Sequence, residues 1–252
     1  MDKQEKSKEE ELAKKYNIDL KKLEKEQEKL AKQLKLKDSI DFSKVVKAGG
    51  ISNVFFQNKI ISAAIVINPD FQIVEQKYFS DKARFPYIPG FRAYRELPAM
   101  VSCFEQLEDK PEVFFIFGHG ISHQRLGLAS HFSLVTGIPA IGIADSLLFG
   151  EVNGENVVKN GKIVGRILKT KEGSRPLYVS PGNLISLESS ANLVRKFIRE
   201  PYKLPEPLRL AHKYSREVMK EIFKSWHCHI LGWWQEFRNE NIVPSTAIAS
   251  EP

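Results

Sequence analysis

Phe85 to Phe132 read FPYIPGFRAYRELPAMVSCFEQLEDKPEVFFIFGHGISHQRLGLASHF. Val113–Phe117, in the middle of this stretch, is an uninterrupted run of bulky apolar residues, which is typical of a β-strand. It leads directly into Gly118-His119-Gly120, and a helix is expected to begin near Arg125. α/β proteins bind ligands where a strand ends in glycines before a helix, because backbone can approach closely and the first helical amides are free. The sequence therefore predicts a ligand site at the end of this strand.

Three segments upstream of this stretch are apolar or alternating and rich in β-branched residues, which is typical of strands. Turn-forming sequences separate them, so the three segments are predicted to fold as an antiparallel meander. The segments are Val45–Ser52, Ile60–Ile67 and Phe71–Phe79, and the turns are Gln57-Asn58-Lys59 and Asn68-Pro69-Asp70.

The rest of the chain shows alternating helical and strand patterns. An antiparallel meander followed by alternating helices and strands is the element order of a ribonuclease H-like fold. We therefore predict the α/β class, with a ribonuclease H-like mixed sheet and flanking helices. Helices are expected from about Gly90 to Leu107, Arg125 to Thr136, Ser186 to Arg199 and Glu206 to Lys224, and strands over Ala140–Ala144, Gly161–Thr170 and Pro176–Val179.

Both ends of the chain differ in composition from its middle. Residues 1–37 are dense in Lys and Glu, with leucines on one helical stripe, which predicts a charged amphipathic helix; a short coiled coil is the alternative. Residues 38–224 are the predicted globular domain, and residues 225–252 an aromatic extension. The triplet His227-Cys228-His229 directs its side chains differently on a helix, which disfavours a metal site. We expect the extension to pack on the body or on a protein partner.

Composition sets broad limits on the class of protein. With 252 residues, 42% of them hydrophobic, the chain can bury the core of one large α/β domain. The net charge of +7, from 38 basic and 31 acidic residues, suits a polyanionic partner without requiring one. Two cysteines, no apolar run of membrane-spanning length and no signal peptide predict a cytoplasmic protein, or a nuclear one in a eukaryote, with no membrane partner.

A series of short motifs runs along the chain in one order: Pro86-Tyr87-Ile88-Pro89-Gly90, Tyr94-Arg95-Glu96, Gly118-His119-Gly120-Ile121, Leu126–His131, Ile138–Gly142, Pro176–Ser180, Ile185–Glu188 and Leu204–His212. Together they resemble the endonuclease V family, a group of DNA-repair nucleases that cut near deaminated purines such as inosine. The resemblance implies a ribonuclease H-like fold and a partner that is single-stranded or lesion-containing DNA or RNA. It also implies Mg²⁺ as the cofactor of an active member.

The resemblance further implies where the metal ligands of an active member would lie. They are an Asp in the first strand, the Glu of the Arg-Glu pair and an Asp that ends the strand before the Gly-His loop, and such oxygen ligands suit Mg²⁺. The Glu is present as Glu96, whereas Gly50 and Phe117 stand at the two Asp positions. Asp145 stands where the family has a lysine, and the family histidine is kept as His212.

These replacements lead to three hypotheses. The one we favour is a degenerate member that binds nucleic acid and has lost metal-dependent cleavage. The second is an active inosine-specific endonuclease, in which Glu96, Asp145 and His212 are catalytic, or in which His119, His123 and His212 join Glu96 at a softer metal such as zinc. The third is a non-catalytic scaffold whose aromatic tail docks a partner.

The residues expected to contact nucleic acid match the family pattern better than the expected metal ligands do. The resemblance implies that Tyr87, in the Pro-rich loop, stacks beside a base drawn out of the duplex; a rigid loop without that role is the alternative. Three positions near the substrate depart from the family pattern, because Arg92 replaces an apolar residue, Gln124 a proline and Leu184 a basic residue. The candidate nucleic-acid contacts are Tyr87, Arg95, Gly118, His119, Gly120, His123, Arg125 and Lys169.

Overall fold

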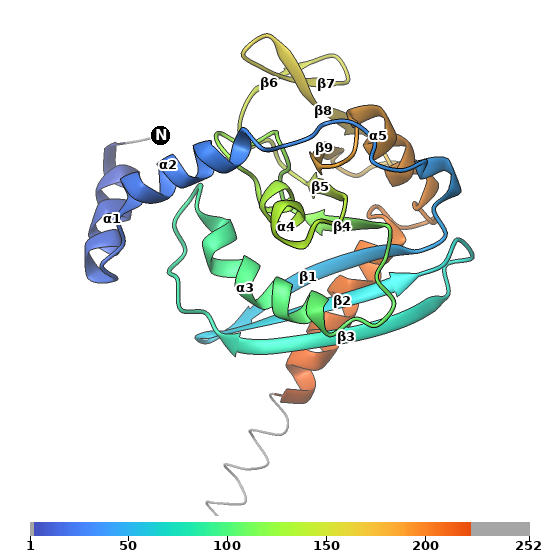
Figure 1. Ribbon diagram of the computed structural model, residues 1–252, viewed down its shortest axis with the longest axis horizontal. Helices are drawn as coiled ribbons and strands as arrows, with labels where there is room; N and C mark the ends of the chain where they lie inside the picture. The colour runs from blue at the N-terminus through green and yellow to red at the C-terminus, as the bar shows by residue number, and fades with distance from the viewer. Residues whose placement is uncertain (1–2, 223–252) are drawn as a thin grey trace, which may run out of the picture.

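The computed structural model describes residues 3–222, which form one nine-stranded sheet with helices on both faces (Figure 1). The strand order is β3-β2-β1-β4-β5-β9-β8-β7-β6, with the parallel pairs β1–β4 and β4–β5 at the centre and antiparallel pairs on either side. The strands are β1 (Ala48–Phe56), β2 (Lys59–Ile67), β3 (Ile73–Lys82), β4 (Val113–Phe117), β5 (Ala140–Ala144), β6 (Glu151–Asn153), β7 (Asn156–Lys159), β8 (Lys162–Leu168) and β9 (Leu177–Asn183).

Helices cover both faces of this sheet. α3 and α4 pack on one face, and α5 packs on the other together with a helix over residues 206–222, drawn in orange and red in Figure 1. α1 and α2 precede the sheet, and α2 contacts α4. The helices are α1 (Lys3–Lys15), α2 (Leu20–Ala31), α3 (Arg92–Glu105), α4 (Leu128–Thr136) and α5 (Leu187–Lys196), with a short 3-10 helix at Phe42–Lys44.

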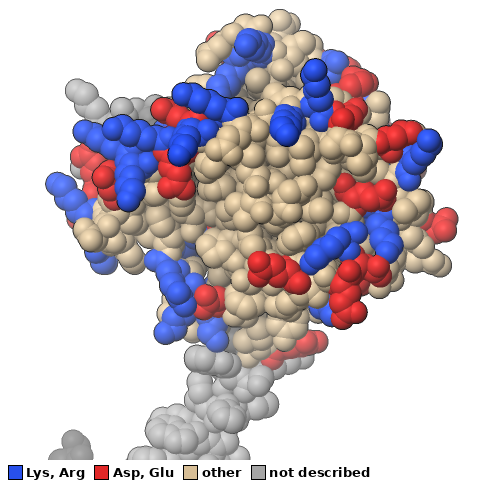
Figure 2. Space-filling model, viewed as in Figure 1, with Lys and Arg blue, Asp and Glu red and all other residues tan. Residues whose placement is uncertain are grey.

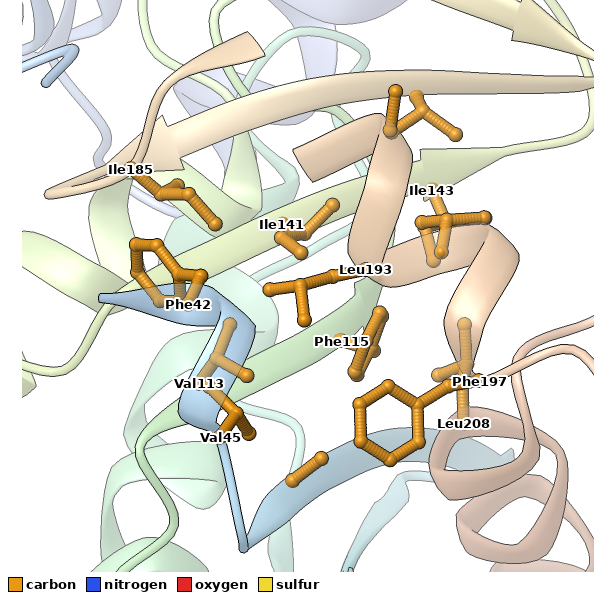
Figure 3. Packing of buried hydrophobic residues seen from close by; sticks show 14 of the residues in the cluster. Phe42, Val45, Val113, Phe115, Ile141, Ile143, Ile185, Leu193, Phe197 and Leu208 are labelled. Atoms are coloured by element: carbon orange, nitrogen blue, oxygen red, sulfur yellow. The ribbon is translucent and has the colours of Figure 1, made fainter. Parts of the chain in front are cut away.

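β4 is apolar throughout because it is covered on both faces. Side chains alternate along a strand, so Val113 and Phe115 face the core beneath α5, whereas Phe114 and Ile116 face the core beneath α3 and α4. Phe115 meets Phe197 edge to face, with ring centroids 5.5 Å apart. Figure 3 shows the first core, in which side chains from β4 and β5 meet those of α5 and of the 206–222 helix.

Local sequence signals set the ends of several helices. Asp19 caps α2 by accepting a hydrogen bond from the Lys22 amide (3.0 Å), and Ser186 caps α5 through the Ser189 amide (3.1 Å). α4 ends at Gly137, which adopts the left-handed conformation with φ +73° that glycine accepts without strain. These residues place the helices where the sequence pattern puts them, to within a few residues.

The mixed sheet with flanking helices confirms the predicted fold, and β5 has the predicted bounds. Several strand bounds shift by up to four residues, and other details differ as well. The N-terminal segment forms two helices rather than one, because the chain turns at Asn17 (φ +53°). α4 begins at Leu128, not Arg125. The β6–β7 hairpin was not predicted, because its strands are only three and four residues long. The predicted aromatic extension lies outside the described residues.

Charged side chains are unevenly spread over the surface. Figure 2 shows Lys and Arg gathered over the N-terminal helices, with acidic side chains among them, while the middle of this face is largely uncharged. The basic surplus is therefore concentrated away from the centre of this face. In the part of the chain that the structure describes, no helix is both long and apolar enough to cross a membrane.

Two isoleucine-to-alanine substitutions, one at a buried and one at an exposed position, test whether β5 lies in the core. Ile143 is fully buried in the core of Figure 3, so Ile143→Ala is expected to lower the free energy of unfolding by about 2–5 kcal/mol through lost burial and a cavity. Ile163, on β8, is 50% exposed, and Ile163→Ala is expected to change it by less than about 0.5 kcal/mol. Urea unfolding of both variants measures the difference, and equal losses would contradict the described core.

Candidate nucleic-acid interface

A pocket of about 160 Å³ opens where the Pro-rich loop before α3 meets the Gly-His loop after β4. Tyr87 lines this pocket and is 63% exposed, so its ring is available to a ligand. Exposure of an aromatic ring beside a pocket is the condition that base stacking requires. The other lining residues are Pro89, Gly90, Arg92, Ala93, His119, His123, Leu126, Leu128 and Leu148.

The Gly-His loop is fixed by backbone packing against two strands. The Gly118 amide donates to the Ile143 carbonyl (2.8 Å), and the Gly120 amide to the Ser180 hydroxyl (2.9 Å). A Cβ atom at Gly120 would lie 2.1 Å from the Pro181 carbonyl oxygen, so only glycine fits there. Gly120 is thus required by the packing of the loop on β9, whether or not it also contacts a ligand.

Two histidines of the pocket are held in the neutral form. His119 Nε2 donates to the Ser146 carbonyl (3.2 Å), and its pKa is lowered chiefly by burial. His123 Nδ1 accepts a hydrogen bond from the Arg125 amide (3.2 Å). Burial, followed by the charges of His119, Arg125 and Lys159, lowers the pKa of His123 to about 4. Both rings are therefore neutral hydrogen-bonding groups at neutral pH.

Arg125 anchors α2 to the pocket. Its Nε donates to Gln27 Oε1 (2.8 Å), its Nη1 donates to Glu24 Oε1 (2.9 Å), and its guanidinium stacks on the Phe91 ring (4.9 Å to the centroid). Gln27 is fully buried and also donates to the Gly90 carbonyl (3.0 Å). The predicted phosphate contact thus has a structural role that the sequence analysis missed. The signal was Gln27, an uncharged residue on the leucine stripe of a helix of Lys and Glu.

The two other predicted basic contacts lie outside the pocket. Arg95 donates to the Phe85 carbonyl (2.6 Å), and its guanidinium lies 4.5 Å from the centroid of the Phe55 ring. Lys169 is exposed and lines a separate hollow beside Arg195 and Ile198. The structure therefore groups Tyr87 with the Gly-His loop and its histidines, and places these two cations elsewhere.

Glu96 projects from the first turns of α3 and is buried, at 3% exposure. Arg92 forms a two-pronged ion pair with it, from Nε to Oε1 and from Nη2 to Oε2 (3.1 Å). Asn53, on β1, donates to the same Oε2 (2.7 Å). Both carboxylate oxygens are thus bound by side-chain donors. The i, i+4 spacing of Arg92 and Glu96 was visible in the sequence and indicates such a pair on a helix.

Gly50 and Phe117 both face the core beneath α5 and the 206–222 helix. A Cβ atom at Gly50 would lie 2.1 Å from the Pro207 carbonyl oxygen and 2.5 Å from the Leu208 nitrogen. Backbone of the helix start therefore occupies the place of any side chain there. Phe117 is partly buried and packs against the same core.

The remaining predicted catalytic residues approach from other directions. His212 Nδ1 lies 3.1 Å from the Ser52 hydroxyl, whereas Glu96 bonds Asn53. Ser52 and Asn53 are successive residues of β1, so their side chains leave the strand on opposite faces. Asp145 is exposed just after β5. The structure does not gather Glu96, Asp145 and His212 into one cluster.

Comparisons with known proteins identify the family. The sequence model of the family described as Endonuclease V matches residues 28–213. The chain belongs to the Endonuclease V family. An Endonuclease V of Thermosipho melanesiensis is 39% identical over 183 residues, which cover 69% of this chain and 80% of that protein. The family assignment therefore rests on most of the described residues.

Solved structures of Endonuclease V proteins share the fold. The protein of Bacillus subtilis superposes with a TM-score of 0.76 at 26% identity, covering 83% of this chain and 96% of that one. The protein of Ciona intestinalis, at 24% identity, superposes with a TM-score of 0.73 over 81% of this chain and 98% of that one. It was solved in complex with a 24mer DNA containing an inosine followed by a ribo-adenosine.

Endonuclease V proteins are metal-dependent nucleases, but the side chains around Glu96 in the described part of this chain do not fit a divalent metal. Mg²⁺ needs several anionic or carbonyl oxygens in near-octahedral geometry. Of the three positions that the resemblance assigns to metal ligands, Glu96 is the one that carries a carboxylate, and Arg92 and Asn53 bind its oxygens. Across residues 3–222, no three His, Cys, Asp or Glu side chains are grouped to hold a metal ion. Within this part of the chain, the structure forms neither the expected magnesium site nor the alternative histidine site.

The lowered pKa of His123 predicts how the free energy of unfolding depends on pH. Between the ordinary value of 6.5 and the folded value of about 4, the unfolded chain binds a proton at His123 that the folded chain does not. The stabilising contribution of His123 to the free energy of unfolding is therefore fully present above pH 6.5 and is lost as pH falls towards 4. By pH 5 the expected loss is about 2 kcal/mol, and His123→Gln should remove it. Urea unfolding at pH 7 and pH 5 tests this, and equal pH dependence in both proteins would contradict it.

A second prediction concerns the first family carboxylate. Gly50→Ala and Gly50→Asp are each expected to lower the free energy of unfolding by more than about 3 kcal/mol, because the new side chain overlaps Pro207 backbone. Gly137→Ala is the control, since nothing lies near its Cβ and only its positive φ is strained, at a cost of about 1 kcal/mol. A Gly50→Asp protein of unchanged stability would show that the position accepts a carboxylate.

Proposed function

We propose that this Endonuclease V family member binds single-stranded or lesion-containing nucleic acid, with an inosine-type base as its preferred ligand, and does not cleave it by metal-dependent hydrolysis. The observation that carries the proposal is the contact between Gly50 and Pro207, because it removes the space of a metal-binding side chain on β1. A nucleic-acid partner is what members of this family act on. The pocket beside Tyr87 is the part of the surface that suits such a partner.

The state of Glu96 supports the loss of hydrolysis. A carboxylate that binds a metal must present free oxygen lone pairs to it. Arg92 occupies both oxygens of Glu96, and a buried arginine–carboxylate pair of this geometry is strongly charge-assisted. Removing Arg92 leaves the buried charge of Glu96 without compensation, which favours keeping this ion pair.

The pocket supports retained binding. Tyr87 offers an exposed ring for stacking. The imidazole rings of His119 and His123 are uncharged and can form hydrogen bonds with an uncharged base. Proteins that read a base outside the helix stack it on an aromatic side chain and hydrogen-bond its edge. The pocket combines both kinds of group within one lining.

Family membership favours a second candidate, the active endonuclease. It would use Glu96 with Asp145 and His212, and it requires these side chains to be brought together by a change of conformation that frees Glu96 from Arg92. The scaffold is favoured by Phe117, which packs as core where the family has a carboxylate. Its proposed tail lies outside the described residues.

Cleavage and binding assays on the same oligonucleotides separate these functions. Single-stranded DNA and RNA carrying one inosine are incubated with Mg²⁺ or Mn²⁺ for cleavage and titrated without metal for binding. We expect binding without cleavage, and a loss of about tenfold in affinity for Tyr87→Ala, because stacking contributes on the order of 1–3 kcal/mol per base. Tyr202→Ala, at an exposed tyrosine outside this pocket, is the control.

Each alternative gives a different result. Cleavage that disappears in Glu96→Ala would overturn the proposal in favour of the endonuclease. Absence of both cleavage and inosine-dependent binding at low salt would leave the scaffold. Binding that Tyr87→Ala does not weaken would remove the stacking role of this residue.

A further inference from the structure

Arg92 stands between the pocket and the buried carboxylate behind it. It is the first residue of α3 and lines the pocket with Tyr87 and His119. Its side chain is 37% exposed, whereas the Glu96 side chain is 4% exposed. The guanidinium therefore presents its outer edge to the pocket and its inner edge to Glu96. A ligand entering the pocket meets the cation first.

The ion pair leaves part of the guanidinium unused. An arginine carries five N–H donors, and Glu96 engages one on Nε and one on Nη2. Nη1 lies 3.3 Å from where a Cβ atom at Gly118 would be, so it borders the loop that ends β4. No acceptor among the described residues is bonded to Nη1. Two parallel N–H groups on a held guanidinium are the arrangement that recognises phosphate.

Cations and carboxylates both lie around the pocket. The charges of Arg125 and Lys159 lower the pKa of His123, and the charge of Arg92 lowers that of His119. Glu24 pairs with Arg125, Glu96 pairs with Arg92, and Asp145 lies near His119. Lys159 is held against this loop by bonds from its Nζ to the carbonyls of His123 (2.6 Å) and Gln124 (2.9 Å). Because Lys159 donates to carbonyls and not to a carboxylate, its positive charge favours an anionic ligand near this loop.

We propose that Arg92 is the resident cation of this pocket and binds a backbone phosphodiester of the nucleic acid through its outer N–H groups, with no divalent metal. This inference rests on the proposed function, which supplies the nucleic acid. The positive charge that contacts phosphate is then the Arg92 side chain, not a bound metal ion. Binding is then independent of free metal.

If Arg92 contacts the phosphate, removing the charge of Glu96 should strengthen binding, which is the opposite of what a metal-binding Glu96 predicts. If Glu96 held a metal that bridged to phosphate, its removal would weaken binding. Here Glu96 positions Arg92, but its negative charge lies directly behind the guanidinium and opposes an approaching anion. Glu96→Gln keeps the side-chain length and one acceptor oxygen for Arg92, replaces the other oxygen by an amide nitrogen that can only donate, and removes that charge. This variant is therefore expected to bind phosphodiester more tightly than the unchanged protein.

Fluorescence anisotropy with a labelled single-stranded inosine DNA, in EDTA and at three salt concentrations, tests the inference. The unchanged protein should bind equally with EDTA or Mg²⁺. Arg92→Leu should weaken binding about tenfold and lower the salt slope by about 0.7, the value for one phosphate contact on a single strand. Arg92→Lys should fall between, because lysine keeps the charge without the fork. Glu96→Gln should tighten binding by severalfold.

Two further variants separate binding from folding. Arg92→Leu leaves Glu96 as an uncompensated buried charge, so the double variant Arg92→Leu/Glu96→Gln removes that charge and should still bind weakly. Arg84→Leu removes an exposed arginine that lines a different pocket, and it should change neither affinity nor slope. Equal binding by the double variant and the unchanged protein would overturn the inference alone. A metal requirement for binding would also overturn it, and an unchanged protein that does not bind would refute the proposed function itself.

Discussion

β4 pairs with a parallel strand on each side and is covered by helices on both faces, and this two-sided burial orders the structure around it. The strand has room for apolar side chains only, so Phe117 continues its pattern to the last residue and packs with the core beneath α5. The same face of β1 carries Gly50, over which the start of the 206–222 helix lies in backbone contact. Both positions thus face the same core, and backbone of the 206–222 helix covers Gly50 from that side.

The pocket that Arg92 lines has its own electrostatic balance. Glu96 would be costly to bury as a free ion, and Arg92 supplies the compensating charge from the same helix one turn earlier. The pair is nearly neutral as a unit, but its two charges differ in exposure, so the pocket meets the positive end. Histidines around it stay neutral because burial and nearby cations oppose their protonation. The pocket thus combines the exposed edge of the Arg92 guanidinium with neutral histidine rings.

Much of the fold was predictable because its signals are local. The run Val113–Phe117, the turn Asn68-Pro69-Asp70 and the Ser186 cap each specify an element without reference to the rest of the chain. The expectation that Gly50 and Phe117 stand at ligand positions came from the resemblance alone and remains a prediction. What the sequence did not predict were long-range contacts. The approach of Pro207 to Gly50 joins residues far apart in the chain, and the bonds of Lys159 depend on a hairpin with little sequence signal. Arg125 was predicted as a phosphate contact, and its structural role was missed because its partners lie on a separate helix.

The buried Gln27 has a consequence for how the loops that border the pocket are held. It bonds Arg125 with its oxygen and the Gly90 carbonyl with its nitrogen, so one amide side chain joins α2 to the two loops that border the pocket. The position of both loops therefore depends on a helix that is far from them in the sequence. Loss of this one amide would remove both of its bonds, to Gly90 and to Arg125, at the same time.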